Sequence, residues 1–193
     1  MRPLINRTAI FIDGAYLDKL LELEFNRTRI DFGKLSKQVN GKGELLRTYY
    51  YHCPPHVSAV PTEEEKARAE SKDRFFAALS RLPRFQTRLG KLVYRGEDRD
   101  GRPIFIQKLV DIMLGVDLVQ LAATRQISRA VLIAGDSDFV PAIEVAKGHG
   151  VLAELWHGPA RSGPSSTVHR ELWDCCDERF EITEELIRQV KRI

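Results

Sequence analysis

The sequence predicts an α/β fold with a central, mainly parallel sheet, and three features indicate it. Residues 8–12 and 130–134 are short apolar runs with β-branched side chains, a composition typical of strands buried on both faces of a sheet. Each run ends at a glycine and an aspartate, which predicts a turn at that point. Between the runs, apolar residues recur at helical spacing, and strands that alternate with helices are typical of parallel sheets.

The elements of the first half follow from local patterns. Leucines and phenylalanines recur at helical spacing in residues 15–25 and 30–39, which predicts two helices after the first strand. Residues 45–52 are rich in aromatic side chains and stop at two prolines, which predicts the second strand. Thr62 precedes three glutamates and indicates a helix start, so residues 62–82 are expected to form a long, charged surface helix.

A hairpin and a buried helix are expected next. Residues 85–95 alternate well enough to form a strand, and residues 97–101 have the composition of a hairpin turn that returns through 103–106. This hairpin is predicted to lie beside the main sheet. Residues 109–123 are apolar almost all round, as expected for a helix packed between the sheet and other elements.

The last third continues the alternation and then closes the domain. A helix at 142–148 and a strand at 151–156 follow the strand at 130–134. Residues 157–167 are rich in glycine, proline and serine and are predicted to form a loop. Residues 168–193 are expected to form a helical closure, so that residues 1–193 make one domain. The closing helices are predicted at 168–176 and 183–191.

Composition limits the classes of function. The formal net charge is +3 with 30% charged residues, so only a local cluster of cations could favour a polyanionic ligand. Three cysteines without metal-ligand spacing suit a reducing, cytoplasmic location. No apolar run approaches the roughly 20 residues that span a bilayer, so neither a signal peptide nor a membrane association is expected.

Several aspartates are placed where a functional site is expected. Asp13 and Asp136 follow strands, and ligands of open α/β sheets bind at the carboxyl ends of strands. Asp111 and Asp117 lie in the apolar helix, where an unpartnered carboxylate costs several kcal/mol. They are separated by about 120° around the helix, so both can reach one site only if Asp111 lies in the first turn. Asp138 is a further acid beside Asp136.

Clustered carboxylates favour a hard cation. They repel one another, and a divalent cation with oxygen ligands relieves the repulsion. Mg²⁺ or Mn²⁺ fits such a site better than Zn²⁺, which prefers nitrogen and sulfur ligands. A hard cation among carboxylates is suited to phosphodiester hydrolysis, which predicts a polyanionic substrate.

Three ordered motifs carry a resemblance to a known family. They resemble those of the NYN family, within the LabA-like (DUF88) group of the PIN-like nuclease superfamily, over residues 8–156. The motifs are Phe11-Ile12-Asp13-Gly14, then Lys108-Leu109-Val110-Asp111 with Asp117, and then Gly135-Asp136-Ser137-Asp138-Phe139 with Pro141.

The resemblance implies a fold, an activity and residue roles. The fold would be a PIN-like three-layer α/β/α sandwich, here with a peripheral hairpin, and the activity a metal-dependent ribonuclease. Asp13, Asp117 and Asp136 would be the core metal carboxylates. Asp111 would be a further metal ligand and Asp138 a supporting acid. One departure is Tyr16, which stands where many members have asparagine.

RNA contacts are expected on neighbouring segments. Single-stranded RNA is favoured because its unstacked bases can use aromatic side chains and one strand enters a narrow pocket more easily than a duplex. The residues predicted to bind RNA are Arg47, Tyr51, Lys91, Arg95 and Lys108.

Structural roles compete with these assignments. Strand-end aspartates also cap helices, Asp138 is well placed to cap before Pro141, and Asp117 could pair with an arginine. Tyrosines in a strand more often pack than stack on bases.

We expect a metal-dependent endoribonuclease that uses Mg²⁺ or Mn²⁺. The alternative is a module of the same fold that binds RNA or protein without cleaving. A phosphatase of the haloacid dehalogenase kind is disfavoured, because Ala15 stands where that chemistry needs a second aspartate. A homodimer is compatible with the sequence, although no feature requires one.

Overall fold

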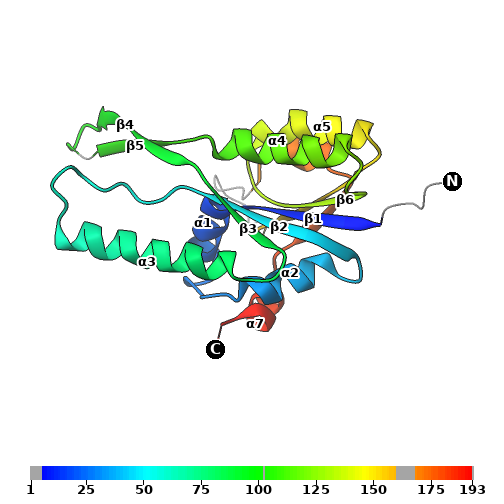
Figure 1. The fold of residues 1–193 in the computed structure, drawn as a ribbon, viewed down its shortest axis with the longest axis horizontal. Coiled ribbons are helices and arrows are strands. Elements are labelled where there is room, and N and C mark those ends of the chain that lie inside the picture. The colour runs from blue at the N-terminus through cyan, green and yellow to red at the C-terminus, as the bar shows by residue number, and fades with distance from the viewer. Residues whose placement is uncertain (1–5, 102, 160–167, 193) are drawn as a thin grey trace.

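A parallel sheet forms the centre of the computed structural model, which describes residues 6–101, 103–159 and 168–192 (Figure 1). The strand order is β3-β2-β1-β6-β7-β8, and each neighbouring pair is parallel. The strands are β1 (Arg7–Asp13), β2 (Glu44–His52), β3 (Phe85–Leu89), β6 (Arg129–Ile133), β7 (Leu152–His157) and β8 (Glu178–Glu181).

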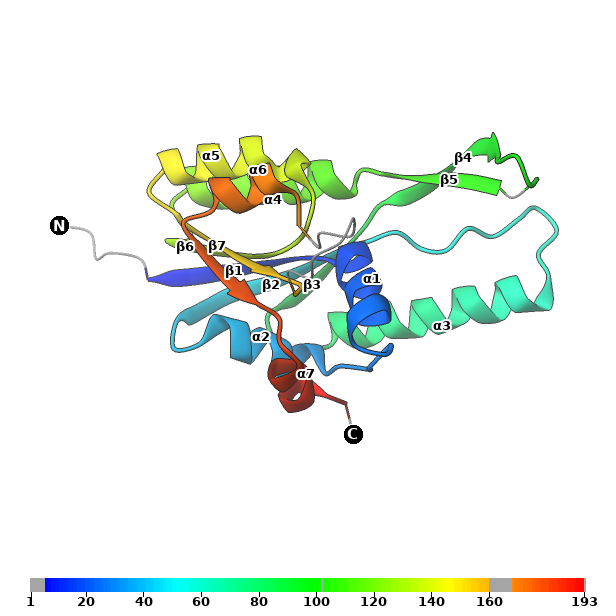
Figure 2. The same ribbon diagram turned by 180° about the vertical axis from the view of Figure 1, so that it is seen from behind.

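Helices cover both faces of this sheet, which confirms the predicted three-layer α/β/α architecture (Figures 1 and 2). One layer contains α4 (Val110–Ala123), α5 (Val140–Gly148) and α6 (Arg170–Cys175). The other contains α1 (Gly14–Glu24), α2 (Phe32–Asn40), α3 (Glu63–Ser80) and α7 (Glu184–Val190).

The side chains of β1 alternate between the two cores. Ala9 and Phe11 pack in the core beneath α4 and α5, whereas Ile10 and Ile12 pack in the core with α1 and α2. Because successive strand residues point to opposite faces, Asp13 is directed towards the layer of α4. The alternation therefore aims the strand-end acid at the helix that carries Asp111.

The sheet reverses its strand order beside β1. β2 and β3 extend it in one direction, and β6, β7 and β8 extend it in the other. Such a reversal leaves a crevice at the carboxyl ends of the two central strands, where α/β proteins usually bind ligands. We call this region, at the carboxyl ends of β1 and β6, the crevice; Asp13 is the last residue of β1, and Asp136 lies three residues after β6.

The predicted strand at 85–95 is wrong in one respect, because Gly90 divides it. β3 joins the main sheet, whereas β4 (Lys91–Glu97) pairs in antiparallel fashion with β5 (Pro103–Lys108). A Cβ on Gly90 would lie 2.4 Å from the carbonyl oxygen of Lys108, so only glycine permits the chain to cross so closely. The expected peripheral hairpin is thus present and projects from the body of the molecule (Figure 1).

The end of the chain differs from the sequence prediction by one strand. β8 is short and polar, so its pattern gives no strand signal, and it is paired only because β7 offers a free edge. The closing helices α6 and α7 are shorter than predicted. Of the loop predicted at 157–167, residues 160–167 lie outside the described residues, and His157 belongs to β7.

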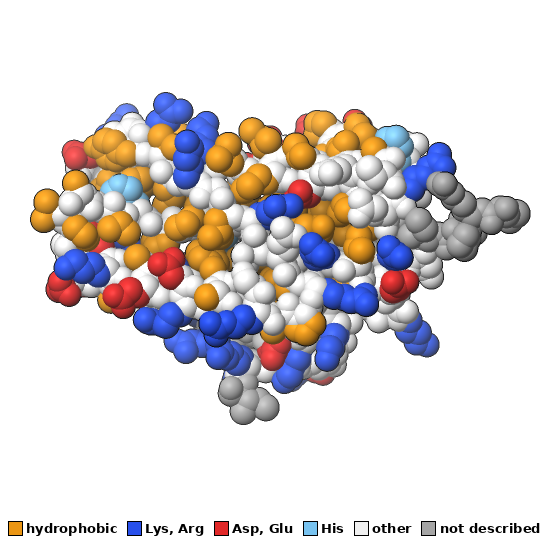
Figure 3. All heavy atoms as spheres, in the orientation of Figure 1, with side chains coloured by type: hydrophobic (Ala, Val, Ile, Leu, Met, Phe, Trp, Pro, Cys, Tyr) orange, Lys and Arg blue, Asp and Glu red, His pale blue; other side chains and the backbone are white. Residues whose placement is uncertain are grey.

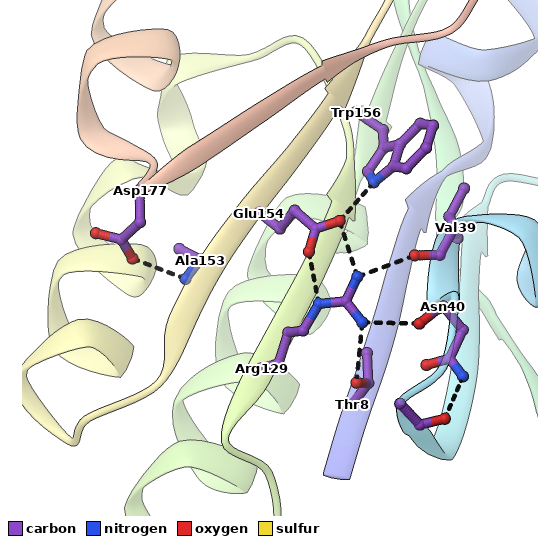
Figure 4. A network of polar contacts seen from close by, with 9 residues as sticks. Thr8, Val39, Asn40, Arg129, Ala153, Glu154, Trp156 and Asp177 are labelled. Carbon is purple, nitrogen blue, oxygen red and sulfur yellow. Dashed lines mark hydrogen bonds and ion pairs between the residues drawn. The ribbon is translucent and has the colours of Figure 1, made fainter. Parts of the chain in front are cut away.

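A polar network holds the opposite, N-terminal ends of the strands together (Figure 4). The Arg129 guanidinium donates to both carboxylate oxygens of Glu154, at 2.5 and 2.9 Å, and Glu154 also accepts from the Trp156 indole at 2.9 Å. The same guanidinium donates to the carbonyl oxygens of Asn40 and Val39, at 2.9 and 3.1 Å. The Glu154 side chain is only 3% exposed, so Arg129 compensates a buried charge.

In the described part of the chain, no helix is both long and apolar enough to cross a bilayer. The three cysteines are free, with Cys53 and Cys176 buried and Cys175 half-buried. Burial raises the pKa of the Cys176 thiol to about 12, so this thiol stays protonated at neutral pH.

Candidate functional site

Asp13 lies at the junction between β1 and α1. Its Oδ1 accepts hydrogen bonds from the backbone N–H groups of Ala15 and Tyr16, at 3.0 and 3.2 Å, and so caps α1. Gly14 makes this junction tight, because a Cβ there would lie 2.6 Å from the Tyr50 hydroxyl. The cap and the tight turn fix the Asp13 carboxylate at the crevice.

The environment of Asp13 disfavours its charge. Burial, reinforced by the negative charge of Asp111, raises the pKa of the Asp13 carboxyl to about 6. The two backbone hydrogen bonds and the nearby His52 act in the opposite direction but do not cancel the effect of burial. Asp13 is therefore a carboxylate that would gain from a cation or a proton.

Asp111 lies in the first turn of its helix, as the prediction from sequence required for a residue of the site. α4 begins at Val110, so Asp111 lies in the first turn of the helix. Partial burial raises its pKa, and the negative charges of Asp136 and Asp138 raise it further. Asp111 is thus the acid that links Asp13 electrostatically to the acids after β6.

Of the two acids after β6, Asp136 forms a cap, whereas Asp138, which the sequence favoured as a cap, does not. Oδ1 of Asp136 accepts from the N–H of Asp138 at 3.1 Å and caps the short 3₁₀ turn η1 (Ser137–Phe139). Asp138 makes no cap, because α5 starts after Phe139 without a side-chain capping bond. Both carboxylates are exposed and lie near Asp111.

Asp117, predicted as a core metal carboxylate, has an arginine and a tyrosine as partners. Its two carboxylate oxygens accept from Nε and Nη2 of Arg88, at 3.0 and 3.2 Å, and Oδ2 also accepts from the Tyr51 hydroxyl at 2.9 Å. Six residues of helix place it about 9 Å along the axis from Asp111. Asp117 is thus paired with an arginine of β3, as the alternative interpretation expected, and we propose that it is not a core metal ligand.

The Asp117→Asn variant tests whether Asp117 is a structural residue or a metal ligand. We expect it to lower the free energy of unfolding by about 1 to 2 kcal/mol, because the ion pair with Arg88 is lost but the arginine is 37% exposed and keeps contact with water. We also expect Mn²⁺ affinity to stay unchanged, measured by isothermal titration. A large loss of Mn²⁺ affinity at unchanged stability would restore Asp117 to the metal site.

The predicted RNA-binding residues fall into two groups. Tyr51 is fully buried and bonded to Asp117, so the prediction that it stacks on bases is wrong. Arg47 lies four residues before it, about 13 Å back along β2 from the crevice, and bonds to Gln86. Lys91 and Lys108 are exposed and face each other at the base of the hairpin, close to α4, whereas Arg95 lies farther out on β4.

Sequence reasoning missed a polar chain beside Asp13. His52, at the end of β2, bonds through Nε2 to Oδ2 of Asp18 at 3.1 Å, and the same oxygen accepts from Nζ of Lys72 at 2.8 Å. The strand-end rule that identified Asp13 would also have identified His52. Asp18 and Lys72 gave no such signal, because they lie among the polar residues of amphipathic helices.

Tyr16 has a structural contact. Its hydroxyl accepts a hydrogen bond from the N–H of Gly158 at 2.9 Å and so ties the start of α1 to the segment after β7. Beside it, the Tyr50 hydroxyl is buried and has no hydrogen-bond partner among the described residues.

The donor set fits a hard cation, with one restriction. Asp13, Asp111 and Asp136 offer oxygen ligands, and two of the three have raised pKa values. Within the described ranges, however, no three His, Cys, Asp or Glu side chains are grouped closely enough to hold an ion by themselves. This restriction is compatible with Mg²⁺, which commonly binds one or two carboxylates, keeps several waters and does not need a site made entirely of protein ligands.

Comparisons with known proteins identify the family and the fold of this chain. The NYN domain family matches residues 7–182. An uncharacterized protein, y4oD of Sinorhizobium fredii (strain NBRC 101917 / NGR234), is 39% identical over 66 residues, which are 34% of this chain and 31% of that protein. A crystal structure of a protein of unknown function, VPA0982 from Vibrio parahaemolyticus RIMD 2210633, covers 96% of this chain and 98% of its own with a TM-score of 0.64 at 18% identity, which indicates the same fold.

Proposed function

The chain belongs to the NYN domain family, a nuclease-like family of PIN-like fold, and from this premise we propose that it is a metal-dependent endoribonuclease of the LabA-like group that cleaves single-stranded RNA. The observation that supports this most is that the charge of Asp111 acts on Asp13, and the charge of Asp136 acts on Asp111, near the carboxyl ends of β1 and β6. NYN and PIN-like nucleases generally use divalent metals, and acids that repel one another at a ligand crevice are suited to hold one.

The residues near the crevice have different proposed roles in metal binding and in phosphate binding. Asp13, Asp111 and Asp136 would hold Mg²⁺ or Mn²⁺, which supplies positive charge for phosphodiester hydrolysis when bound. In the absence of a cation Asp13 has a pKa of about 6, so a bound cation would replace a proton that this carboxylate readily takes up. Asp138 adds negative charge beside Asp111, and Lys91 and Lys108 offer cations to the phosphates of the incoming strand.

Asp136→Asn is the variant that tests the activity. The amide oxygen can still cap the 3₁₀ turn, so the fold is retained, while one negative charge of the crevice is removed. We expect the natural protein to cut single-stranded RNA in Mn²⁺ and the variant to be slower by about two orders of magnitude. The measurement is single-turnover cleavage of an end-labelled oligonucleotide resolved on a denaturing gel.

Two outcomes would contradict the proposal. Equal cleavage by the natural protein and by Asp136→Asn would assign the activity to a contaminant. RNA that is bound but not cut by either protein, in Mg²⁺ and in Mn²⁺, would favour the binding module of the same fold.

A further inference from the structure

A second cleft lies on the face of the sheet opposite α4. α1 and α3 lie in this layer at a steep angle to each other (Figure 2), and residues of both line the cleft, together with the connection from α1 to α2 and Arg192 near the chain end. Its volume is about 670 Å³. We call it the α1–α3 cleft. None of the acids of the crevice lines it.

The α1–α3 cleft gathers positive charge. Two acidic side chains, Asp18 and Glu22, line it together with six cationic ones, a local net charge of +4 where the whole chain carries +3. Lys and Arg side chains gather along the lower edge of the molecule in the view of Figure 3, beneath α3 and around α7. The cationic lining residues are Arg27, Arg29, Arg68, Lys72, Arg74 and Arg192.

Lys72 pairs with Asp18 and Arg27 pairs with Glu22, whereas the partners of Arg68 and Arg74 hold them weakly. Arg74 pairs with Glu70 at 3.5 Å, and both side chains are about 70% exposed. Arg68 donates to the carbonyl oxygen of His56 at 3.2 Å on the protein surface. Exposed pairs of this kind contribute little free energy, so a phosphate can replace the partner at small cost. The charges of Arg68 and Arg74 are therefore available to an anionic ligand.

The floor of the cleft is apolar and partly aromatic. Phe75 is half-buried, and its ring is held by edge contacts with Tyr50 and Phe32 at 5.8 and 5.5 Å between centroids. Lys72 Nζ lies 5.5 Å from the centre of the same ring. A fixed aromatic ring beside cations is the combination by which proteins bind single-stranded nucleic acid, with the ring stacking on a base and the cations contacting phosphates.

The cleft is connected to the catalytic crevice. α1 starts directly after Asp13, and its first turns carry Asp18, which bonds both to His52 beside Asp13 and to Lys72 in the cleft. The eleven residues of α1 extend about 16 Å from the crevice. An RNA strand that leaves the crevice and follows α1 would therefore reach the α1–α3 cleft.

We propose that the α1–α3 cleft binds several nucleotides of the single-stranded RNA whose scissile phosphate lies at Asp13. The inference rests on the proposed function, since it takes RNA as the substrate. It assigns the binding of the strand mainly to Arg68, Arg74 and Phe75, rather than to the tyrosines of β2.

The test compares two double variants of α3 with the same change of charge. Arg68→Glu/Arg74→Glu alters the cleft, whereas Lys66→Glu/Arg81→Glu alters exposed residues of α3 and its cap that do not line it. Affinity for a labelled oligouridylate is measured by fluorescence anisotropy in EDTA, so that binding is read without cleavage, and circular dichroism verifies that both variants are folded.

We expect the cleft variant to lose affinity by about tenfold or more and to reduce the salt slope of log K by about 1.4, the value for two lost phosphate contacts on a single strand. We expect the control variant to lose much less. Phe75→Leu should weaken binding by roughly five- to tenfold with an unchanged salt slope, because only stacking is lost.

The outcomes separate this inference from the proposed function. Equal losses in the two double variants overturn the inference even if RNA is cleaved. Cleft-dependent binding by a protein that cuts no RNA supports the cleft as the binding site for the strand and overturns the nuclease. Uridine monophosphate that competes as well as the oligouridylate, at equal nucleotide concentration, would show a mononucleotide pocket and overturn the strand path.

Discussion

Asp13→Asn is expected to make the protein more stable near pH 7.5 and at the same time to slow RNA cleavage by about two orders of magnitude or more. The asparagine oxygen can still accept from the N–H groups of Ala15 and Tyr16, so the cap of α1 is retained. What is lost is the charge that burial and Asp111 disfavour. Stability and activity therefore change in opposite directions.

The sign of the pH dependence follows from the raised pKa. With a folded pKa of about 6 and an ordinary value of 3.8, Asp13 holds a proton in the folded state that the unfolded chain releases between these two pH values. Its contribution to stability is thus present below the ordinary pKa and is lost as pH rises through about 6. A shift of roughly two pH units corresponds to about 2 to 3 kcal/mol.

The measurement is the melting temperature of the natural protein and of Asp13→Asn from about pH 4 to about pH 8. We expect the variant to melt about 4 to 10 °C higher above pH 7 and at the same temperature near pH 4. Asp18 and Asp177, whose pKa values are lowered, titrate in both proteins and cancel in the difference. Melting curves that coincide at every pH would show that the folded state does not disfavour the charge of Asp13.

Arg129→Met is expected to cause the largest loss of stability, about 3 to 5 kcal/mol, because it leaves the buried carboxylate of Glu154 without its cation. The carbonyl oxygens of Val39 and Asn40 lose their donor as well. Arg129→Met/Glu154→Leu should recover part of the loss, since no charge remains buried. Urea unfolding followed by tryptophan fluorescence measures both variants.

A surface ion pair provides the control for this second prediction. Arg188 pairs with Glu185 on α7, where both side chains are more than half exposed, so Arg188→Met should change stability by no more than about 0.5 kcal/mol. If Arg129→Met had an effect as small as this, the network of Figure 4 would not hold the strand ends together.

The sequence was sufficient to predict the layers because the dominant signals are local. Buried parallel strands such as β1 and β6 are continuous apolar runs, and the helices between them show a clear helical period. Gly90 and β8 escaped prediction because their roles depend on distant partners. Gly90 is needed where the backbone passes Lys108, and β8 is a strand only beside β7.

The candidate site was predictable in part, for a related reason. Asp13, Asp111 and Asp136 follow from strand ends and from the first turn of a helix, positions that can be read from the chain. The ion pair between Asp117 and Arg88 depends on which strand lies under α4, and no sequence pattern specifies that choice. Tyr51 was misassigned because an aromatic run does not show which of its rings are covered.

The central claim is that Asp13 belongs to a carboxylate site that holds a hard cation, and the most direct test is the effect of Mn²⁺ on thermal unfolding. The natural protein should show a saturable rise in melting temperature with Mn²⁺ at neutral pH, Asp13→Asn should show little or none, and Asp117→Asn should respond like the natural protein. A rise of equal size in the natural protein and in Asp13→Asn, or no rise in the natural protein, would contradict the account.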